Sequence, residues 1–349
     1  MSQKSPKKIA APVTWFGSKS RYVKSIVKEF PEHQTFVDVF GGSGAILLGK
    51  KPSKVEVYND INSKMSSLFK VLSDDKKTKE LVRRLELTPY SREYFKECQG
   101  KLDYTQDEIE LAKLMIVVQR QSHGGLAKQW SYCIDAPAGG YSASVRKFHA
   151  GIERLPDIHK RIRKVQIENS DFSDLIPRYD RSRTLFYLDP PYVPETRVDG
   201  SYEYEMTIGE HEALVSLVLS CDGMFILSGY QSYVYEPLEA AGWKRLEIET
   251  IASTSRNRSK RVECLWLSPN CRVTEKIERP KDIQSDDSLT ERQKAAYSVH
   301  RKRTQESEAK IKSAINSLKR TGRRISKAEV SRMTGLSREH ISRHYSSLF

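Results

Sequence analysis

The sequence predicts an α/β fold with three parts: a mostly parallel sheet flanked by helices, an inserted mostly helical domain, and a small all-α domain at the C-terminus. Short, nearly continuous apolar runs are typical of strands buried on both faces of a sheet. Amphipathic stretches such as residues 20–30 and 210–220 lie between some of these runs, as in α/β proteins. Polar, helix-like sequence interrupts this alternation over residues 75–156.

The apolar runs define the expected core sheet. They are Thr35–Phe40, Lys54–Asp60, Lys164–Asp171, Thr184–Asp189 and Gly223–Gly229. Two later runs, Trp243–Ala252 and Arg261–Ser268, are expected to pair as a hairpin. The core therefore comprises residues 1–74 and 157–270, and residues 75–156 form an insertion between its second and third strands. Long excursions of this kind usually carry function.

Composition and charge limit the function classes. The chain has 349 residues and a net charge of +14, which favours a polyanionic partner such as nucleic acid over a general solubility charge. No apolar run reaches the roughly 18 residues of a membrane span, and no apolar segment typical of a secretory signal follows the basic N-terminus. The five cysteines are scattered, so no metal site is expected, and their odd number suits a reducing cytoplasm.

A glycine turn follows the first expected strand, in "FVDVFGGSGAILL" (Phe36–Leu48). Glycines at the end of a strand allow a close approach of the backbone to a nucleotide-like ligand, although a plain tight turn is the alternative. Asp60 ends the next strand, where an acidic side chain can accept hydrogen bonds from ribose hydroxyls. Its alternative role is to cap the helix that follows. Upstream, Trp15 and Lys19 in "WFGSK" could close over the same ligand.

The segment "DPPY" (Asp189–Tyr192) follows a buried strand, in the position where open α/β sheets bind ligands. Its prolines keep the backbone out of a helix, so the Asp189 carboxylate and the Pro190 carbonyl can both act as acceptors. Tyr192 adds a flat ring that can stack. Two acceptors beside a stacking ring suit the exocyclic amine of a nucleic-acid base, which must leave a duplex to be reached. An ordinary proline turn is the alternative.

The C-terminal region is basic and helical in pattern. Residues 271–290 are expected to be a linker and residues 291–349 a helix-turn-helix-like extension. Ser326 and Glu329 form a capping box, and a glycine turn follows at Thr334–Ser337. Arg338 and Arg343 would then lie on the helix that reads DNA. The alternative is a helical bundle that forms a homodimer.

Taken in their order along the chain, "WFGSK", "DVFGGSGA" and "DPPY" resemble the Dam-type DNA adenine methyltransferases over about residues 12–269. The resemblance implies a Rossmann-like methyltransferase core, S-adenosylmethionine as methyl donor, and adenine N6 in double-stranded DNA as acceptor. The cofactor residues that it implies are Trp15, Lys19, Asp38, Phe40, Gly41, Gly42, Ser43, Gly44, Asp60, Asp171, Phe172 and Asp189. The catalytic residues that it implies are Asp189, Pro190, Pro191 and Tyr192.

DNA contacts are expected in two polar stretches besides the C-terminal extension. The insertion does not follow the family's usual pattern here, so the familiar GATC target is not carried over. The candidates are Arg120, Gln121, Ser122, His123 and Lys128 in the insertion, and Arg256, Arg258, Lys260 and Arg261 in a later basic loop.

Other acceptors and functions remain open at this point. Pocket chemistry alone also allows cytosine N4 or an RNA adenine, and the extension alone also allows a DNA-binding regulator. Because no endonuclease motif is recognised, a cytoplasmic DNA-modification enzyme is expected, of the kind found in restriction–modification systems.

Overall fold

The computed structural model describes residues 9–15, 17–134, 142–193, 204–250, 261–272, 309–318 and 325–334. Its contacts divide the chain into two units, Met1–Glu278 and Arg279–Phe349. The first unit contains both the expected core and the insertion.

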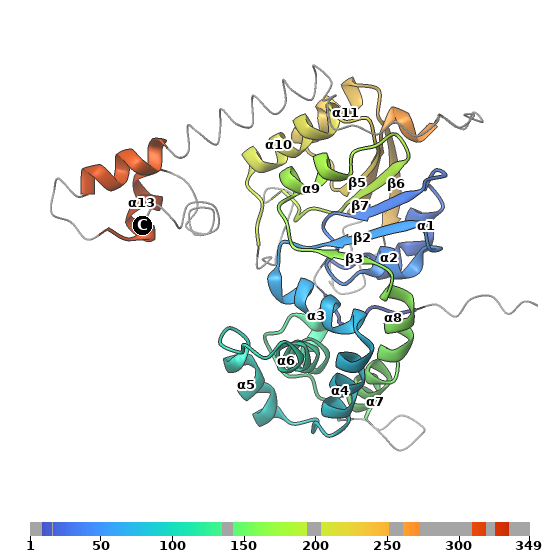
Figure 1. Cartoon of the computed structure of the whole chain (residues 1–349), viewed down its shortest axis with the longest axis vertical. Coiled ribbons are helices and arrows are strands. Elements are labelled where there is room, and N and C mark those ends of the chain that lie inside the picture. Colours follow the sequence, from blue (N-terminus) through green and yellow to red (C-terminus); the bar gives the residue numbers. More distant parts are fainter. Residues whose placement is uncertain are drawn as a thin grey trace, which may run out of the picture. The chain divides into compact units, whose positions relative to one another are not determined.

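In the described residues the core is one seven-stranded sheet with the strand order β3-β2-β1-β4-β5-β7-β6 (Figure 1). The first five strands run parallel, and β7 lies antiparallel between β5 and β6. The strands are β1 Thr35–Asp38, β2 Val55–Asn59, β3 Gln166–Glu168, β4 Thr184–Leu188, β5 Met224–Gly229, β6 Lys244–Thr250 and β7 Arg261–Leu267. The predicted α/β class and the predicted hairpin are both confirmed.

Each face of the sheet is covered by its own hydrophobic cluster, as the continuous apolar strands predict. Along β4, Leu185 and Tyr187 join one cluster, which includes residues of α1, α2 and α3. Phe186 and Leu188 join the other, which includes residues of α9 and α10. All of β4 is buried. A charged side chain that follows this strand must therefore lie beyond its end, at the carboxyl edge of the sheet.

Two of the longer core helices, α3 and α10, begin at polar caps. Asn62 accepts the first amide hydrogens of α3, and Thr207 with Glu210 forms a capping box at α10. The stretch 20–30 that we predicted as one helix divides into a short 3₁₀ turn and the helix α1. The core elements are η1 Lys19–Arg21, α1 Val23–Val27, α2 Ala45–Gly49, α3 Ser63–Ser73, α9 Phe172–Tyr179, α10 Ile208–Leu219, η4 Tyr233–Tyr235, α11 Glu236–Ala240 and η5 Pro269–Arg272.

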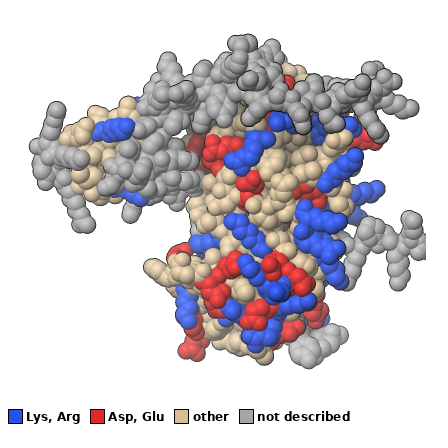
Figure 2. Space-filling view, viewed as in Figure 1, with Lys and Arg blue, Asp and Glu red and all other residues tan. Residues whose placement is uncertain are grey.

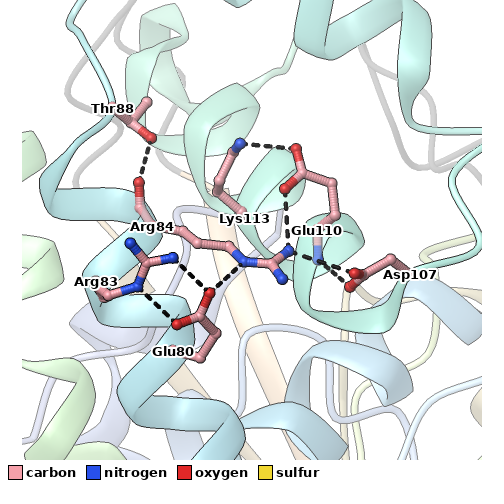
Figure 3. A network of polar contacts seen from close by, with 7 residues as sticks. All are labelled: Glu80, Arg83, Arg84, Thr88, Asp107, Glu110 and Lys113. Carbon is pink, nitrogen blue, oxygen red and sulfur yellow. Dashed lines mark hydrogen bonds and ion pairs between the residues drawn. The ribbon is translucent and has the colours of Figure 1, made fainter.

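The insertion is helical in its described residues and forms a layer below the sheet in Figure 1. Ion pairs link its helices: Glu80 binds Arg83 and Arg84 on α4, and Arg84 reaches Glu110 on α6 at 3.3 Å (Figure 3). Lys113 joins Glu110 at 2.7 Å. Its elements are α4 Asp75–Glu86, α5 Arg92–Lys101, α6 Glu108–Gln121, η2 His123–Gly125 and α7 Ala143–Ile152, and α8 Leu155–Ile162 crosses from its end into the core.

Positive charge is not confined to the C-terminal extension. Figure 2 shows Lys and Arg side chains gathered on the side of the molecule where α1, α2 and α8 lie. None of the described helices is long and apolar enough to cross a membrane. The described residues also contain no group of three side chains suited to hold a metal ion.

The second unit contains two described helical stretches, residues 309–318 and α13 (Lys327–Thr334). Ser326 accepts the Glu329 amide hydrogen at 3.2 Å, as expected for the start of a capped helix. Ile311, Ile315 and Leu318 pack with Val330 in a small apolar cluster. Residues 335–349, with Arg338 and Arg343, lie outside the described residues, so the expected second helix of the motif stays a prediction.

Candidate active site

Three carboxylates lie at the carboxyl edge of the sheet. Because β1 pairs in parallel with both β2 and β4, the ends of these three strands lie side by side. Asp38 ends β1, Asp60 follows β2, and Asp189 follows β4. The strand order changes direction at β1, which is the position where open α/β sheets bind their ligands.

The loop after β1 is closely packed and needs its glycines. A Cβ on Gly41 would lie 2.3 Å from the Tyr58 ring, and one on Gly44, whose φ is +68°, would lie 2.5 Å from the Phe69 ring. The loop backbone is also tied to β2, because Gly41 N donates to the Asn59 carbonyl at 2.7 Å and the Tyr58 hydroxyl donates to the Gly42 carbonyl at 2.7 Å. The glycine turn is therefore a fixed, closely packed cradle at the end of β1.

The Asp60 carboxylate is bound on both oxygens. It accepts from Gly42 N at 2.7 Å and from Asn62 N at 2.8 Å. Asn62, and not Asp60, caps α3, so the structure does not give Asp60 the capping role that was the alternative. Asp60 instead holds the glycine loop against the end of β2.

Asp171 and Phe172 follow β3 on the far side of β2. Asp171 caps α9 by accepting from Ser173, and Phe172 lies beside Phe40 with ring centroids 6.0 Å apart. Phe172 is thus brought next to the glycine loop. Asn59, which the sequence reasoning missed, links these loops: its amide donates to the Val39 and Ser170 carbonyls and accepts from Ser170 N.

The "WFGSK" segment lies over this cradle. The Trp15 ring would lie 3.2 Å from a Cβ on Gly42, and the hydroxyls of Ser18 and Ser43 are 2.8 Å apart. These contacts fix the start of η1, and Lys19 reaches from η1 into the crevice.

Lys19 is at the centre of a buried polar network. Its Nζ donates to Asp189 Oδ1 and to the Tyr192 hydroxyl, both at 2.6 Å. Glu263 on β7 accepts from the Tyr192 hydroxyl at 2.7 and 2.9 Å and from Ser228 Oγ at 2.7 Å. Glu263 Oε1 also lies 3.6 Å from Lys19 Nζ. The network joins η1, the segment after β4, and two later strands.

Burial and neighbouring charges shift the pKa values of Asp189, Lys19 and Asp38. Burial raises the pKa of Asp189 to about 6, with Lys19 opposing and Glu263 reinforcing the shift. Burial alone would lower the pKa of Lys19, but the carboxylates of Asp189 and Glu263 raise it, so Lys19 is a cation at neutral pH. Burial, then Asp189 and Asp60, raise the pKa of Asp38 to about 8. Asp38 Oδ2 is buried and has no hydrogen-bond partner in this structure.

A cavity of about 690 Å³ opens beside this network. Lys19, Tyr192, Tyr230 and Glu263 line it on the core side, and Arg120 and Gly124 line it on the insertion side. The Tyr192 and Tyr230 rings lie 4.5 Å apart at their centroids. The cavity therefore brings two aromatic rings together with the Lys19 ammonium and the Glu263 carboxylate.

The candidate DNA contacts of the insertion lie in two different environments. The Arg120 guanidinium donates to the Pro12 and Ala11 carbonyls, and Gln121 and Ser122 are buried. Gln121 binds Pro89 and Trp130, and Ser122 binds the backbone of its own loop. Gln121 and Ser122 therefore hold the insertion together, and Arg120 joins it to the N-terminal segment, which a polar stretch in a sequence does not reveal. His123 and Lys128 are exposed, as a DNA contact requires.

The later basic loop is only partly within the described residues. Arg256, Arg258 and Lys260 lie outside them, and Arg261 begins β7 without a described side chain.

Glu263 is the main site residue that the sequence reasoning missed. It lies in the apolar strand "RVECLWLS", and its partners Tyr192 and Lys19 are far away in sequence. The available signal was an acidic residue among the apolar residues of a central strand, since a charge there needs a buried partner.

A mostly parallel α/β sheet, with a glycine cradle after β1 and a D-P-P-Y segment after β4, defines a Rossmann-like methyltransferase. Residues 15–244, about two thirds of the chain, match the family of D12 class N6 adenine-specific DNA methyltransferases. The chain belongs to this family and is an adenine-specific DNA methyltransferase, as the resemblance implied. A comparison with curated proteins found no match.

Proposed function

We propose that this protein takes a methyl group from S-adenosylmethionine and transfers it to the N6 amine of an adenine flipped out of double-stranded DNA. The observation that carries the proposal is the partly buried Asp189 carboxylate after β4. It already accepts a hydrogen bond from Lys19 Nζ at 2.6 Å, beside the Tyr192 ring. An amino group of a base could take the same place.

The residues present fit S-adenosylmethionine, which carries a sulfonium and an ammonium charge and two ribose hydroxyls. Asp38 and Asp60 place two carboxyl groups at one edge of the sheet, and Asp38 Oδ2 is buried without a partner. The Gly41–Gly44 cradle is held rigid by its own hydrogen bonds, so its shape is fixed before a ligand binds. We infer that Trp15 and the cradle, with Phe40 and Ser43, hold the amino-acid part, Asp60 the ribose, and Asp171 with Phe172 the adenine ring.

S-adenosylmethionine, when bound, supplies an electrophilic methyl group. The exocyclic amine of adenine is a poor nucleophile because its lone pair is delocalised into the ring. Asp189 and the Pro190 carbonyl would accept hydrogen bonds from the two N–H groups of this amine. These two hydrogen bonds favour a localised lone pair on the nitrogen. Pro191 keeps this backbone extended, and Tyr192 packs against the base. Because its pKa is raised to about 6, Asp189 is also a better acceptor than an ordinary aspartate for the proton that the methylated amine loses.

The rate advantage would come from positioning and electrostatics, since no covalent intermediate is needed. The aromatic-lined cavity at Tyr192 and Tyr230 is where we place the flipped base.

On the DNA side, we infer that the insertion and the basic segments contact the duplex. Besides His123 and Lys128, the insertion has an exposed aromatic ring, Tyr132, stacked on Trp130, with the Arg92 guanidinium over both rings. Exposed aromatic and basic groups together suit nucleic acid. We propose Arg256, Arg258, Lys260 and Arg261 as phosphate contacts, and Arg338 and Arg343 as groove contacts of the helix that reads DNA. The enzyme would act where the DNA is, in the cytoplasm.

The test is to incubate the purified full-length protein with radiolabelled S-adenosylmethionine and plasmid DNA, and to identify the labelled nucleoside after digestion. Labelled N6-methyladenine is expected, and sequencing that reads modified bases then gives the target sequence. Label in N4-methylcytosine, or in RNA but not in DNA, would contradict the proposal.

Asp189→Ala should lower the rate by at least about 100-fold, because the acceptor for the amine is lost. Its affinity for S-adenosylmethionine, measured by calorimetry, should stay close to that of the wild type. Asp103→Ala, which removes an exposed carboxylate of the insertion, is the matched control and should retain activity. Normal methylation by Asp189→Ala would exclude the proposed site.

A further inference from the structure

Glu263 is a buried acid whose position is fixed from three sides. It lies on β7, which pairs with β5 so that Ser228 is opposite Leu265 and Gly229 opposite Cys264. Only 3% of Glu263 is exposed. The Tyr192 and Ser228 hydroxyls donate to it, and Lys19 Nζ lies 3.6 Å away. A buried carboxylate needs such donors to remain charged.

The proposed reaction creates a problem for Lys19. An adenine amine that binds Asp189 must displace the Lys19 ammonium, which now lies 2.6 Å from that carboxylate. Lys19 is 4% exposed, and its other acceptors, the Tyr192 hydroxyl and the Gly17 carbonyl, carry no formal charge. Its raised pKa means that it remains charged. A displaced ammonium in a buried site requires another carboxylate within reach.

We propose that Glu263 is a positioning residue for methyl transfer, which receives the Lys19 ammonium when the target amine takes Asp189 and holds the Tyr192 hydroxyl throughout. A small movement of Nζ closes the 3.6 Å gap to Glu263, and Nζ can keep its bond to the Tyr192 hydroxyl during it. The inference rests on the proposed function.

The same arrangement couples Glu263 to the titration of Asp189. The charged and titratable groups around Asp189 come from every neighbouring element: Lys19 from η1, Asp38 from β1, Tyr187 from β4, Tyr192 after β4, Tyr235 from η4 and Glu263 from β7. The negative charge of Glu263 contributes to the raised pKa of Asp189. Removing that charge, and leaving Lys19 bound to Asp189 alone, lowers the pKa of Asp189.

The experiment measures single-turnover methylation by the full-length enzyme against pH, for the wild type, Glu263→Gln, Glu263→Asp and Glu247→Gln. Glu263→Gln should lower the rate at neutral pH about 100-fold, because Lys19 stays on Asp189 and Tyr192 loses its fixed partner. The acid limb of its pH–rate profile should move to lower pH, while its affinity for S-adenosylmethionine stays the same as that of the wild type. Glu263→Asp keeps the charge and should keep the acid limb in place with an intermediate rate. Glu247→Gln, on the neighbouring strand β6, should behave as wild type.

A Glu263→Gln enzyme with a normal rate, or a slow one with an unmoved acid limb, would overturn the inference. So would a loss of rate that is matched by a loss of folded protein or of cofactor affinity, since that is a structural role. If Glu263→Gln does not fold, a shifted acid limb in Glu263→Asp would overturn it. An inactive wild type would instead contradict the proposed function, so the two failures are distinguishable.

Discussion

Asp38 is a single buried residue whose ionisation would respond to a bound cation. Its carboxyl group is buried, with one oxygen unpartnered, and burial together with Asp189 and Asp60 raises its pKa to about 8. Most molecules therefore hold a proton on Asp38 at neutral pH. A bound sulfonium or ammonium group would favour the ionised form, so cofactor binding should release that proton.

The affinity for S-adenosylmethionine is thus expected to rise with pH up to about 8 and to level off above it. Calorimetry in buffers of different ionisation enthalpy, at pH 7, should show the release of a proton on binding. Asp38→Asn cannot ionise, so its affinity should be lower and should lose this pH dependence. Equal proton release by the wild type and Asp38→Asn would contradict the assignment.

Individual site residues differ in how far they could be predicted. Asp189 was predictable because a charge directly after an apolar strand must lie at the edge of the sheet. The Lys19 contact to Asp189 and the Glu263 contact to Tyr192 were not predictable, because they join positions 170 and 71 residues apart. Spacing along the chain carries no information about such pairs, and only the folded sheet brings them together.

At the scale of elements, the end of α6 holds the N-terminal segment that leads into the active site. The Arg120 guanidinium donates to the Pro12 and Ala11 carbonyls at 2.6 and 2.9 Å. Trp15 and Lys19 follow directly, against the glycine cradle and Asp189. Burial, and to a lesser degree Arg154, lower the pKa of Arg120 to about 10, so it remains charged at neutral pH. This side chain therefore connects the insertion to the segment that leads into the candidate site.

Arg120→Met should therefore destabilise the protein by about 2–4 kcal/mol, since two carbonyls lose a charged donor. Urea unfolding of the variant measures this, and hydrogen exchange should increase in residues 9–15. The salt dependence of DNA binding separates the structural role from the DNA contact that the sequence suggested. A phosphate contact would lower the slope by about 1, whereas a structural role leaves it unchanged.

The elements themselves were mostly predictable, and their surfaces were not. Apolar runs correctly predicted the strands, and the capping pattern at Ser326 predicted α13. The polar stretch at 120–122 looked like exposed surface, yet Gln121 is fully buried and binds Pro89 and Trp130. In a sequence, a buried polar side chain that makes hydrogen bonds to a loop looks the same as an exposed polar side chain that contacts DNA.

At the scale of the whole molecule, much of the charge lies in the second unit. Residues 279–349 contain 17 Lys and Arg and 8 Asp and Glu, a net charge of +9 of the total +14. A chain ending at Glu278 keeps the methyltransferase unit complete, including η5, whose Cys271 contacts the Phe225 carbonyl of β5.

If the extension binds DNA, the chain 1–278 should bind the same duplex more weakly and with a shallower salt dependence than the full chain. Its single-turnover rate at saturating DNA should be close to that of the full chain, because the described active-site contacts lie within residues 1–278. Fluorescence titrations at several salt concentrations measure both slopes. An unchanged slope would exclude phosphate contacts by the extension. Sedimentation of the two chains then shows whether it forms the homodimer that was the alternative.

The central position of β1 also affects how this chain is made. Its partner β4 aligns Thr184 with Thr35, so the two paired residues are 149 positions apart, with the whole insertion between them. At the usual speed of synthesis, roughly 5–20 residues per second, the nascent β1 waits about 7 to 30 seconds for that neighbour. During this interval one apolar edge of the half-built sheet is open to other chains. Expression at lower temperature or with extra chaperone should therefore raise the yield of folded enzyme more than it does for a fold whose strands pair in sequence.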